Sequence, residues 1–213
     1  KSEFLKIPSG RTETKLTGFY LVTSPGRRAT ILLDDISVTE DKSYGCTQYT
    51  QDFADAAPEG WSGGTVETKD GRRVMHIGSD TVTAKIPEFL GGTSMAFDWS
   101  VDDPSGSGTL FAFGTETETV GTLSYQNGVL GYEKDGGSIL FDQLGKIRAG
   151  QVYRIRLEYV KDAAYENNRV DYYVNDVRIG SAAAAAAAES IDCLRFTAAD
   201  SGMDIANVSV VKR

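Results

Sequence analysis

The sequence predicts an all-β fold, an antiparallel β-sandwich, and three observations lead to this prediction. The chain of 213 residues contains 23 glycines, 10 tyrosines and 9 phenylalanines, a composition typical of many short strands joined by tight turns. Turn-forming pairs recur between runs of strand-like residues. Several of these runs alternate apolar and polar side chains, and no long stretch has the period of a helix.

The turns come first, because they divide the chain into strands. Asp70-Gly71 and Asn127-Gly128 are pairs that two-residue hairpins prefer, since both turn residues need a positive φ. Asn175-Asp176 is a weaker third turn. The flanking strands are expected at residues 65–68 and 74–77, 122–125 and 130–132, and 169–174 and 178–180.

The alternation shows which face of a strand is buried. In residues 152–160, four apolar residues take one face of the strand, and Arg154, Arg156 and Glu158 take the other. Residues 94–101 alternate in the same way. Such strands are half-buried, as in an antiparallel sandwich. The apolar sets are Tyr153, Ile155, Leu157 and Tyr159 in the first strand, and Met95, Phe97, Trp99 and Val101 in the second.

A repeated phrase divides the chain into two modules. Residues 35–38 read Asp-Ile-Ser-Val and residues 207–210 read Asn-Val-Ser-Val, and each is expected to be the last strand of its module. Residues 1–44 are then the C-terminal part of a first β-sandwich module plus a linker, and residues 45–213 are a complete second module. Two strands cannot bury a core alone. Either a missing segment or another chain completes the first module, or its strands pack onto the second module.

The formal net charge is −8, and lysines and arginines form no long block. Such a surface repels phosphate backbones and anionic lipid, so no nucleic acid and no membrane is expected as a partner. No stretch is long and apolar enough for a membrane-spanning helix. Because the chain starts at Lys1 without methionine, we expect a processed or excised piece. The expected location is secreted or cell surface.

The cysteines and an alanine run have simple interpretations. Cys46 and Cys193 fit no metal-binding spacing. They form either one disulfide, which would stabilise the fold by about 2–5 kcal/mol, or two buried thiols. Ala182–Ala188 is too short for a lone helix, and we expect a loop there.

Seven short segments together resemble the concanavalin-A-like and laminin-G-like jelly rolls, which are common accessory carbohydrate-binding modules of bacterial polysaccharide-degrading enzymes. The resemblance covers nearly all of residues 45–213 and implies a jelly-roll sandwich. Residues 14–39 resemble the end of a xylan- or glucan-binding jelly-roll module. The seven segments are Gln51–Phe53, Gly60-Trp61, Asp70-Gly71, Phe97-Asp98, Gly150–Tyr153, Asp171–Asn175 and Asn207–Val210.

Three aromatic residues are candidates for carbohydrate binding, because sugar rings stack on aromatic rings while their hydroxyls need polar partners. Trp61 follows Pro58-Glu59-Gly60 in an expected loop, although it is equally suited to plugging the edge of the sandwich. Tyr125 and Tyr132 flank the Asn127-Gly128 turn, where we expect exposed side chains. Trp99 alternates with Phe97 and Met95 and is assigned to the core.

A structural calcium ion is the expected cofactor. The resemblance implies one calcium where the first and last strands of the module meet, which points to Asp52 and Asp204, with Asp35 as the counterpart in the first module. Calcium takes six to eight oxygen ligands. The alternative is that these are solvated loop carboxylates.

No catalytic motif is recognisable. His76 is the only histidine, and no Gly-x-Ser-x-Gly motif accompanies it. The Glu-x-Asp-x-x-Glu strand of the jelly-roll glycosidases that the fold resembles is also missing. Glu116 and Glu118 would share one face of a strand, where we expect them to be solvated rather than catalytic.

The sequence therefore favours a non-catalytic carbohydrate-binding module of a secreted multidomain polysaccharide-active protein. The expected partners are a polysaccharide or glycan and the other domains of the parent protein. Two alternatives stay open, since one fold serves many functions. One is part of a polysaccharide hydrolase or lyase, and the other is an adhesion or interdomain spacer domain without a sugar site.

Overall fold

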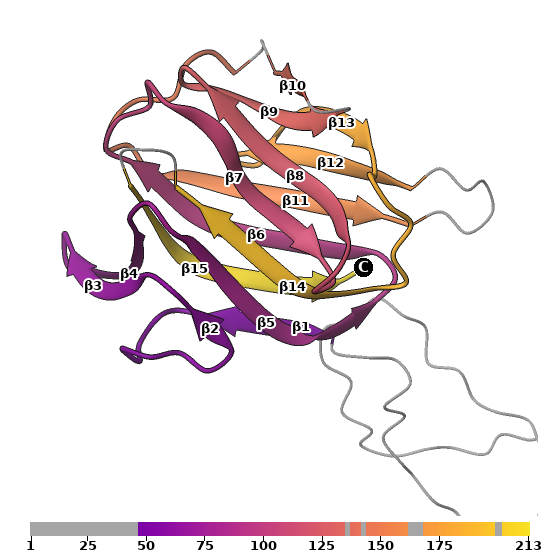
Figure 1. Ribbon diagram of the computed structural model, residues 1–213, viewed down its shortest axis with the longest axis horizontal. Coiled ribbons are helices and arrows are strands. Elements are labelled where there is room, and N and C mark those ends of the chain that lie inside the picture. Colours follow the sequence, from indigo (N-terminus) through magenta and orange to yellow (C-terminus); the bar gives the residue numbers. More distant parts are fainter. Residues whose placement is uncertain (1–46, 135–136, 142–143, 162–167, 199–201) are drawn as a thin grey trace, which may run out of the picture. The chain divides into compact units, whose positions relative to one another are not determined.

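The computed structural model of the chain describes residues 47–134, 137–141, 144–161, 168–198 and 202–213. These residues form β-strands and no helix, as the sequence predicts (Figure 1). Accordingly, none of them belongs to a helix able to cross a membrane. The first module predicted for residues 1–44, with Asp35, lies outside the described residues, and so does Cys46.

The strands form two antiparallel sheets that pack as a sandwich (Figure 1). Sheet A has seven strands. Its spatial order is β10 (Gly137–Leu140), β9 (Val129–Lys134), β8 (Thr119–Gln126), β7 (Ser107–Gly114), β14 (Ser190–Thr197), β5 (Thr81–Leu90) and β2 (Trp61–Ser62).

Sheet B has eight strands. Its last strand in the chain, β15, lies in the interior of the sheet, where it pairs with β6 on one side and with β4 and β1 on the other. The spatial order is β13 (Val177–Ala183), β12 (Arg169–Val174), β11 (Tyr153–Val160), β6 (Thr93–Val101), β15 (Met203–Lys212), β4 (Arg72–Ile77) and β3 (Thr65–Lys69), with β1 (Gln48–Gln51) beside β15.

All three predicted hairpin turns are confirmed. Asp70-Gly71 joins β3 to β4, Asn127-Gly128 joins β8 to β9, and Asn175-Asp176 joins β12 to β13. Both residues of each turn have a positive φ, between 48° and 80°, which is the backbone conformation that two-residue hairpins need. The local sequence therefore fixes these three strand connections.

The core lies between the sheets and is built from the apolar residues of the alternating strands. Phe97 of sheet B packs against two rings of sheet A, with ring centroids 4.9 Å from Phe111 and 5.1 Å from Phe196. Trp99 is only 1% exposed, which confirms its assignment to the core. Cys193 is also buried and has a free thiol.

Candidate functional site

Trp61 closes the edge of the sandwich. Its indole N–H donates a hydrogen bond to the Tyr49 hydroxyl at 2.8 Å. Its ring meets Phe53 edge-on at a centroid distance of 4.9 Å and stacks on Phe196 at 5.7 Å. Trp61 thus follows the edge-plug alternative, with its ring partly buried against the core.

Tyr125 is not exposed, and the expectation that it borders the surface beside the hairpin is wrong. Its side chain is 2% exposed and lies 6.2 Å from the Trp99 ring, centroid to centroid. The reason is the register of the hairpin. Tyr125 pairs directly with Leu130, and both face the core, because side chains opposite each other in a sheet share a face. The turn itself is exposed, but the strand that enters it is already core.

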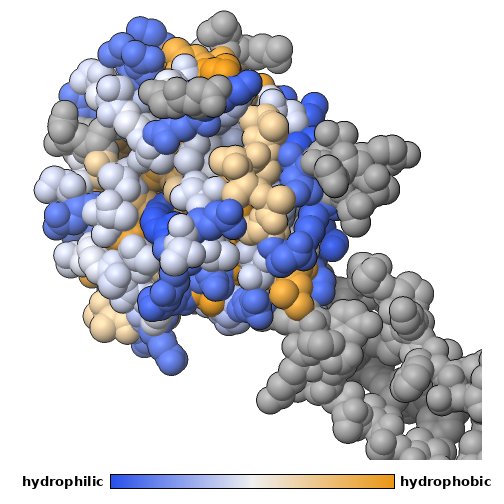
Figure 2. Space-filling model, turned by 45° about the vertical axis from the view of Figure 1, so that its right-hand side comes forward, coloured by the Kyte–Doolittle hydropathy of each residue, from blue (hydrophilic) through white to orange (hydrophobic). Residues whose placement is uncertain are grey.

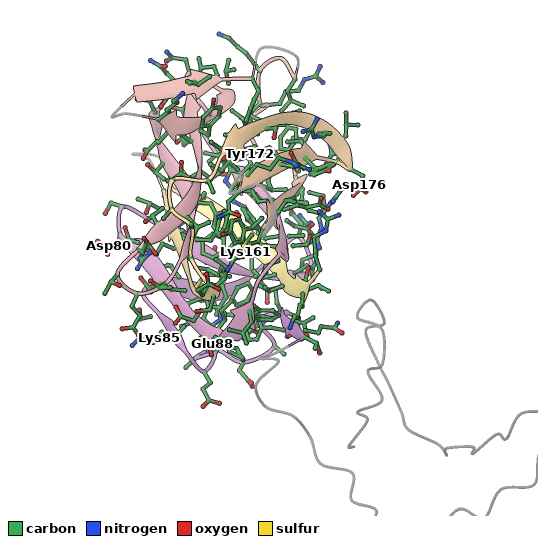
Figure 3. The ribbon with its side chains drawn as sticks, turned by 90° about the vertical axis from the view of Figure 1, so that its right-hand side faces the viewer. Asp80, Lys85, Glu88, Lys161, Tyr172 and Asp176 are labelled. Atoms are coloured by element: carbon green, nitrogen blue, oxygen red, sulfur yellow. The ribbon has the colours of Figure 1, made fainter. Side chains whose placement is uncertain are left out.

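Tyr132 lies at the rim of the sandwich and lines a hollow. Its ring stacks on Tyr172 at a centroid distance of 5.9 Å and packs at a tilt against Phe141 at 5.7 Å. Figure 3 shows the neighbouring Tyr172 between the two sheets. The hollow, which we call the rim hollow, has a volume of about 380 Å³, and its lining includes Tyr132, Tyr172, Thr119, Thr122, Glu133 and Lys134.

Polar groups around the rim hollow are held in place by hydrogen bonds. The Thr109 hydroxyl donates to the Glu133 carboxylate. The backbone N–H of Glu133 donates to the Thr122 hydroxyl at 3.0 Å. Thus two tyrosines, threonine hydroxyl groups, a carboxylate and Lys134 border a single depression. Ligand pockets have volumes of about 300–1,000 Å³, so the rim hollow suits a short ligand.

The three predicted sugar-binding aromatics do not form one site. Trp61 belongs to β2 at one edge of sheet A, whereas Tyr132 belongs to β9 near the opposite edge. Tyr125 lies in the core between the sheets. Of the three, Tyr132 is the one that lines the rim hollow.

The Asp204 carboxylate is the centre of a polar group on sheet B. Asp204 is 5% exposed and lies opposite His76 in the pairing of β15 with β4. One of its oxygens is 2.8 Å from Nδ1 of His76, and the other accepts a hydrogen bond from Nζ of Lys69 at 2.7 Å. This contact with Asp204 raises the pKa of Lys69.

Glu67 completes a group of metal-ligating side chains with His76 and Asp204. One ligand atom from each of the three residues lies within 4.8 Å of the others. Within the described part of the chain, this is the arrangement of three such residues that stands out as able to hold an ion. We call it the Asp204 group.

Asp52 lies elsewhere, directly after β1, and does not belong to the Asp204 group. Its side chain is exposed and accepts a hydrogen bond from the backbone N–H of Ala54 at 3.0 Å. This is the local turn contact that aspartate makes when it follows a strand. The first and last strands of the module do meet, as expected, since β1 pairs with β15.

The outer face of sheet B carries two buried carboxylates directly opposite each other. Glu158 of β11 and Asp171 of β12 are a cross-strand pair, and each is 5% exposed. Arg156 and Arg213 form ion pairs with Glu158, and Nη1 of Arg213 lies 2.7 Å from Oε2 of Glu158. The Tyr173 hydroxyl also donates to Glu158, at 3.2 Å.

Asp171 has its own set of donors. Arg178 Nη2 and the Ser181 hydroxyl both donate to the same oxygen of Asp171, Oδ1, each at 2.7 Å. Nε of Arg169 donates to the other oxygen at 3.3 Å. Burial raises the pKa of Asp171, but the hydrogen bonds from Arg178 and Ser181, with the charges of Arg178 and Arg169, outweigh it and leave the pKa lowered. Asp171 is therefore ionised at neutral pH.

Sequence reasoning missed Glu158 and Asp171 as buried residues. The alternation correctly placed Glu158 on the polar face of its strand. Charged residues on a polar face are normally solvated, and nothing in the local pattern shows that two strands and the C-terminal Arg213 converge there. The density of arginines in residues 154–178 is the one feature of the sequence that indicates paired carboxylates there.

Glu116 and Glu118, the two acids considered from the sequence, are both exposed. Glu116 forms an ion pair with Lys85, and this hydrogen bond lowers the pKa of Glu116. Figure 3 shows Lys85 at the surface of sheet A, away from Asp176. An exposed, ionised carboxylate paired with lysine is poorly suited to protonating a leaving group.

The face of the molecule drawn in Figure 2 is mainly hydrophilic. Figure 2 shows charged and polar side chains over most of the visible face, with hydrophobic residues in separate patches. Ile139 and Val177 are the large hydrophobic side chains that stand exposed among the described residues. Single exposed hydrophobic side chains of this kind are normal on a protein surface, so the described surface favours polar ligands over an apolar partner.

Known structures share this fold at low sequence identity. A sialidase has a TM-score of 0.60 and 16% identity over 78% of this chain and 18% of its own. A structure named Crh5 transglycosylase has a TM-score of 0.52 and 9% identity over 79% of this chain and 85% of its own. The receptor-binding domain of botulinum neurotoxin mosaic serotype C/D has a TM-score of 0.52 and 11% identity over 78% of this chain and 43% of its own.

The comparisons identify the fold and not the activity. No protein-family model matches the sequence, and no curated protein is similar to it. The chain spans about a fifth of the sialidase and less than half of the neurotoxin domain. These relatives include enzymes and a receptor-binding domain, so the fold does not decide between catalysis and binding. The chain has the concanavalin-A-like jelly-roll β-sandwich fold, which it shares with carbohydrate-active proteins.

Proposed function

We propose that this chain is a non-catalytic carbohydrate-binding module of a secreted multidomain polysaccharide-active protein. The observation that carries the proposal is the rim hollow, which brings a half-buried tyrosine ring, threonine hydroxyls, a carboxylate and an ammonium group together in about 380 Å³. A sugar ring needs this combination, since its C–H face stacks on an aromatic ring and its hydroxyls need donors and acceptors.

The few contacts that the rim hollow offers set the expected affinity for a glycan. One aromatic contact contributes on the order of 1 kcal/mol beyond the burial of area. With a few hydrogen bonds, this gives a dissociation constant in the micromolar to millimolar range. Weak single sites become effective when several modules act on one polymer, because the second contact is intramolecular. The proposed first module in residues 1–44 fits such an arrangement.

The fold supports the same function. The sialidase and the transglycosylase that share it act on sugars, as their names state. In this chain, the acid pair named from the sequence is exposed, and Glu116 is bound to Lys85. These observations favour binding over cleavage.

We further propose that the Asp204 group holds a metal ion. Zinc takes an imidazole nitrogen together with carboxylate oxygens, whereas calcium prefers six to eight oxygens. The donors of His76, Glu67 and Asp204 therefore suit zinc better than the calcium that the family resemblance implied. Lys69 would leave Asp204 and keep its contact with Asp102, which lies 3.1 Å from Nζ.

Glycan titration of single variants tests the function. We expect Glu133→Gln and Tyr132→Ala to weaken binding of a panel glycan by about tenfold or more, because each removes a group that borders the rim hollow. Trp61→Ala is the matched aromatic control: it should lower the melting temperature, since Trp61 packs on Phe196, and leave glycan affinity unchanged.

Two outcomes would overturn the proposal in different ways. If the unmodified chain binds a glycan and both rim-hollow variants bind it equally well, the site is elsewhere. If it binds no neutral or acidic glycan in the panel, the spacer alternative is favoured. Glu133→Gln guards against a folding defect, because Glu133 is exposed, whereas Tyr132 packs against two rings.

A further inference from the structure

Four arginines surround the two buried carboxylates on the outer face of sheet B, on the face opposite to the core. Each carboxylate is paired with two guanidinium groups, Glu158 with the first pair and Asp171 with the second. We call these residues the arginine quartet: Arg156 and Arg213, and Arg169 and Arg178.

The arginine quartet carries more positive charge than its carboxylates need. One guanidinium neutralises one carboxylate, and a second brings repulsion between like charges. Even with the exposed Asp176 carboxylate, 3.9 Å from Nε of Arg156, four guanidinium groups face three carboxylates. In a chain with a net charge of −8, the internal ion pairs do not explain this local excess of positive charge. A guanidinium has five N–H donors, and the contacts to Glu158 and Asp171 use one or two of them in each arginine.

The guanidinium groups are both anchored and accessible. The side chains of Arg169, Arg178 and Arg213 are 49%, 52% and 46% exposed. Arg156 is less exposed and lies over the Tyr173 ring, 3.7 Å from its centroid. Buried carboxylates thus hold exposed arginines in fixed positions. Less rotamer entropy is lost when an anchored arginine binds a ligand.

We propose that the arginine quartet binds the carboxylate groups of an acidic oligosaccharide, such as one built from uronic acids. This rests on the proposed glycan-binding function and names a second surface and a ligand class for it. Arginine donors match the geometry of a carboxylate, which they bind in a bidentate manner. The acidic groups elsewhere on the chain oppose this little, because charges are screened beyond about 8 Å at physiological salt.

Asp176 provides a test that distinguishes ligand binding by the arginine quartet from a purely structural role. It lies in the β12–β13 turn, where its side chain is 84% exposed, and its carboxylate is 3.9 Å from Nε of Arg156. Figure 3 shows Asp176 at the outer surface of the molecule. As a negative group beside the arginine quartet, it competes with an incoming carboxylate. Removing its charge should therefore tighten binding.

The experiment measures binding of trigalacturonate and of its fully methyl-esterified, neutral form by calorimetry. We expect the acid to bind and the ester to bind at least tenfold more weakly. Arg178→Gln and Arg213→Gln should each weaken binding of the acid by about tenfold, and Asp176→Asn should strengthen it. Lys85→Gln on sheet A removes the same charge far from the arginine quartet and should change nothing.

The glutamine variants should fold, because Asp171 keeps Arg169 and Ser181 when Arg178 is replaced, and Glu158 keeps Arg156 when Arg213 is replaced. Unchanged melting temperatures would verify this. Equal affinity for acid and ester, or no effect of either arginine variant, overturns the inference. If, in that case, Tyr132→Ala abolishes glycan binding, the proposed function stands and only the role of the arginine quartet is lost. If neither sugar nor any panel glycan binds, both fail.

Discussion

At the scale of single residues, the most unusual feature is the pair of buried carboxylates on an otherwise solvated face. Glu158 and Asp171 are each 5% exposed and are direct cross-strand neighbours. Like charges opposite each other destabilise a sheet, and burying a charge is costly unless it is paired. Both carboxylates are therefore tolerated only because arginine, tyrosine and serine donors satisfy them.

The pH dependence of stability follows from Asp171. Its pKa is lowered below the ordinary value of 3.8, so its stabilising contribution is fully present above about pH 4 and is lost as the pH falls through the lower folded-state pKa. We expect Asp171→Asn to destabilise the fold by about 1–3 kcal/mol at pH 7 and to flatten the loss of stability that occurs as the pH falls below about 4. Urea denaturation at several pH values measures both effects.

Asp176→Asn is the control for this prediction, because its carboxylate is exposed and makes only a distant contact with Arg156. Its stability should follow the same pH profile as the unmodified chain. If Asp171→Asn also keeps that profile, the arginine contacts contribute nothing to acid stability.

Metal binding at the Asp204 group is a second prediction at this scale. Zinc should raise the melting temperature of the chain, because a ligand that binds only the folded state stabilises it, and calcium should have a smaller effect. His76→Ala should abolish the zinc shift, and Asp52→Ala should retain it, since Asp52 lies outside the group. A melting temperature that does not respond to zinc, or that responds equally in His76→Ala, contradicts the proposal.

At the scale of secondary-structure elements, the hairpin turns show how local chemistry fixes a connection. Gly71 has a φ of +75°, and a Cβ atom there would meet nothing within 4 Å. A substitution at this position therefore causes backbone strain without a steric clash. Left-handed backbone costs an L-residue about 1–2 kcal/mol more than glycine.

We expect Gly71→Ala to lower the free energy of unfolding by about 1 kcal/mol. Gly78 is the matched control, because its Cβ would also meet nothing and its φ lies outside the left-handed region. Gly78→Ala should be neutral or slightly stabilising, since alanine restricts the unfolded chain. Chemical denaturation of the two variants compares them directly. Equal effects would show that the turn does not depend on a positive φ.

At the scale of the whole molecule, the last strand organises sheet B. β15 pairs with β6, β4 and β1, so residues from both ends of the module must be present before this sheet is complete. Contacts between distant segments close slowly in folding. Because β15 joins segments from both ends of the module in one sheet, we expect the module to unfold as one cooperative unit.

The domain boundary predicted from the sequence is tested at the same scale. We expect a chain of residues 45–213 to show a single unfolding transition and a β-rich circular dichroism spectrum without residues 1–44. Limited proteolysis of the full chain should cut within residues 39–45 and leave the larger fragment folded. If the shorter chain fails to fold, or if cleavage lowers its melting temperature by several degrees, residues 1–44 belong to the same structural unit.

The sequence by itself determined the fold class, the three turns and the buried positions of the alternating strands. These depend on backbone conformations and side-chain periods that neighbouring residues set locally. Trp99 was assigned to the core in this way. Tyr125 was misjudged because a residue next to an exposed turn can still face the core when its strand enters the sandwich.

Only the tertiary structure decided which polar residues meet. The partner of Asp204 is His76 and not the expected Asp52, because the register of β15 against β4 places Asp204 opposite His76. Glu158 and Asp171 become buried because β11 and β12 pair directly and arginines from separate segments reach them. Register between strands that are distant in sequence is set by how the whole core packs, and no local pattern records it.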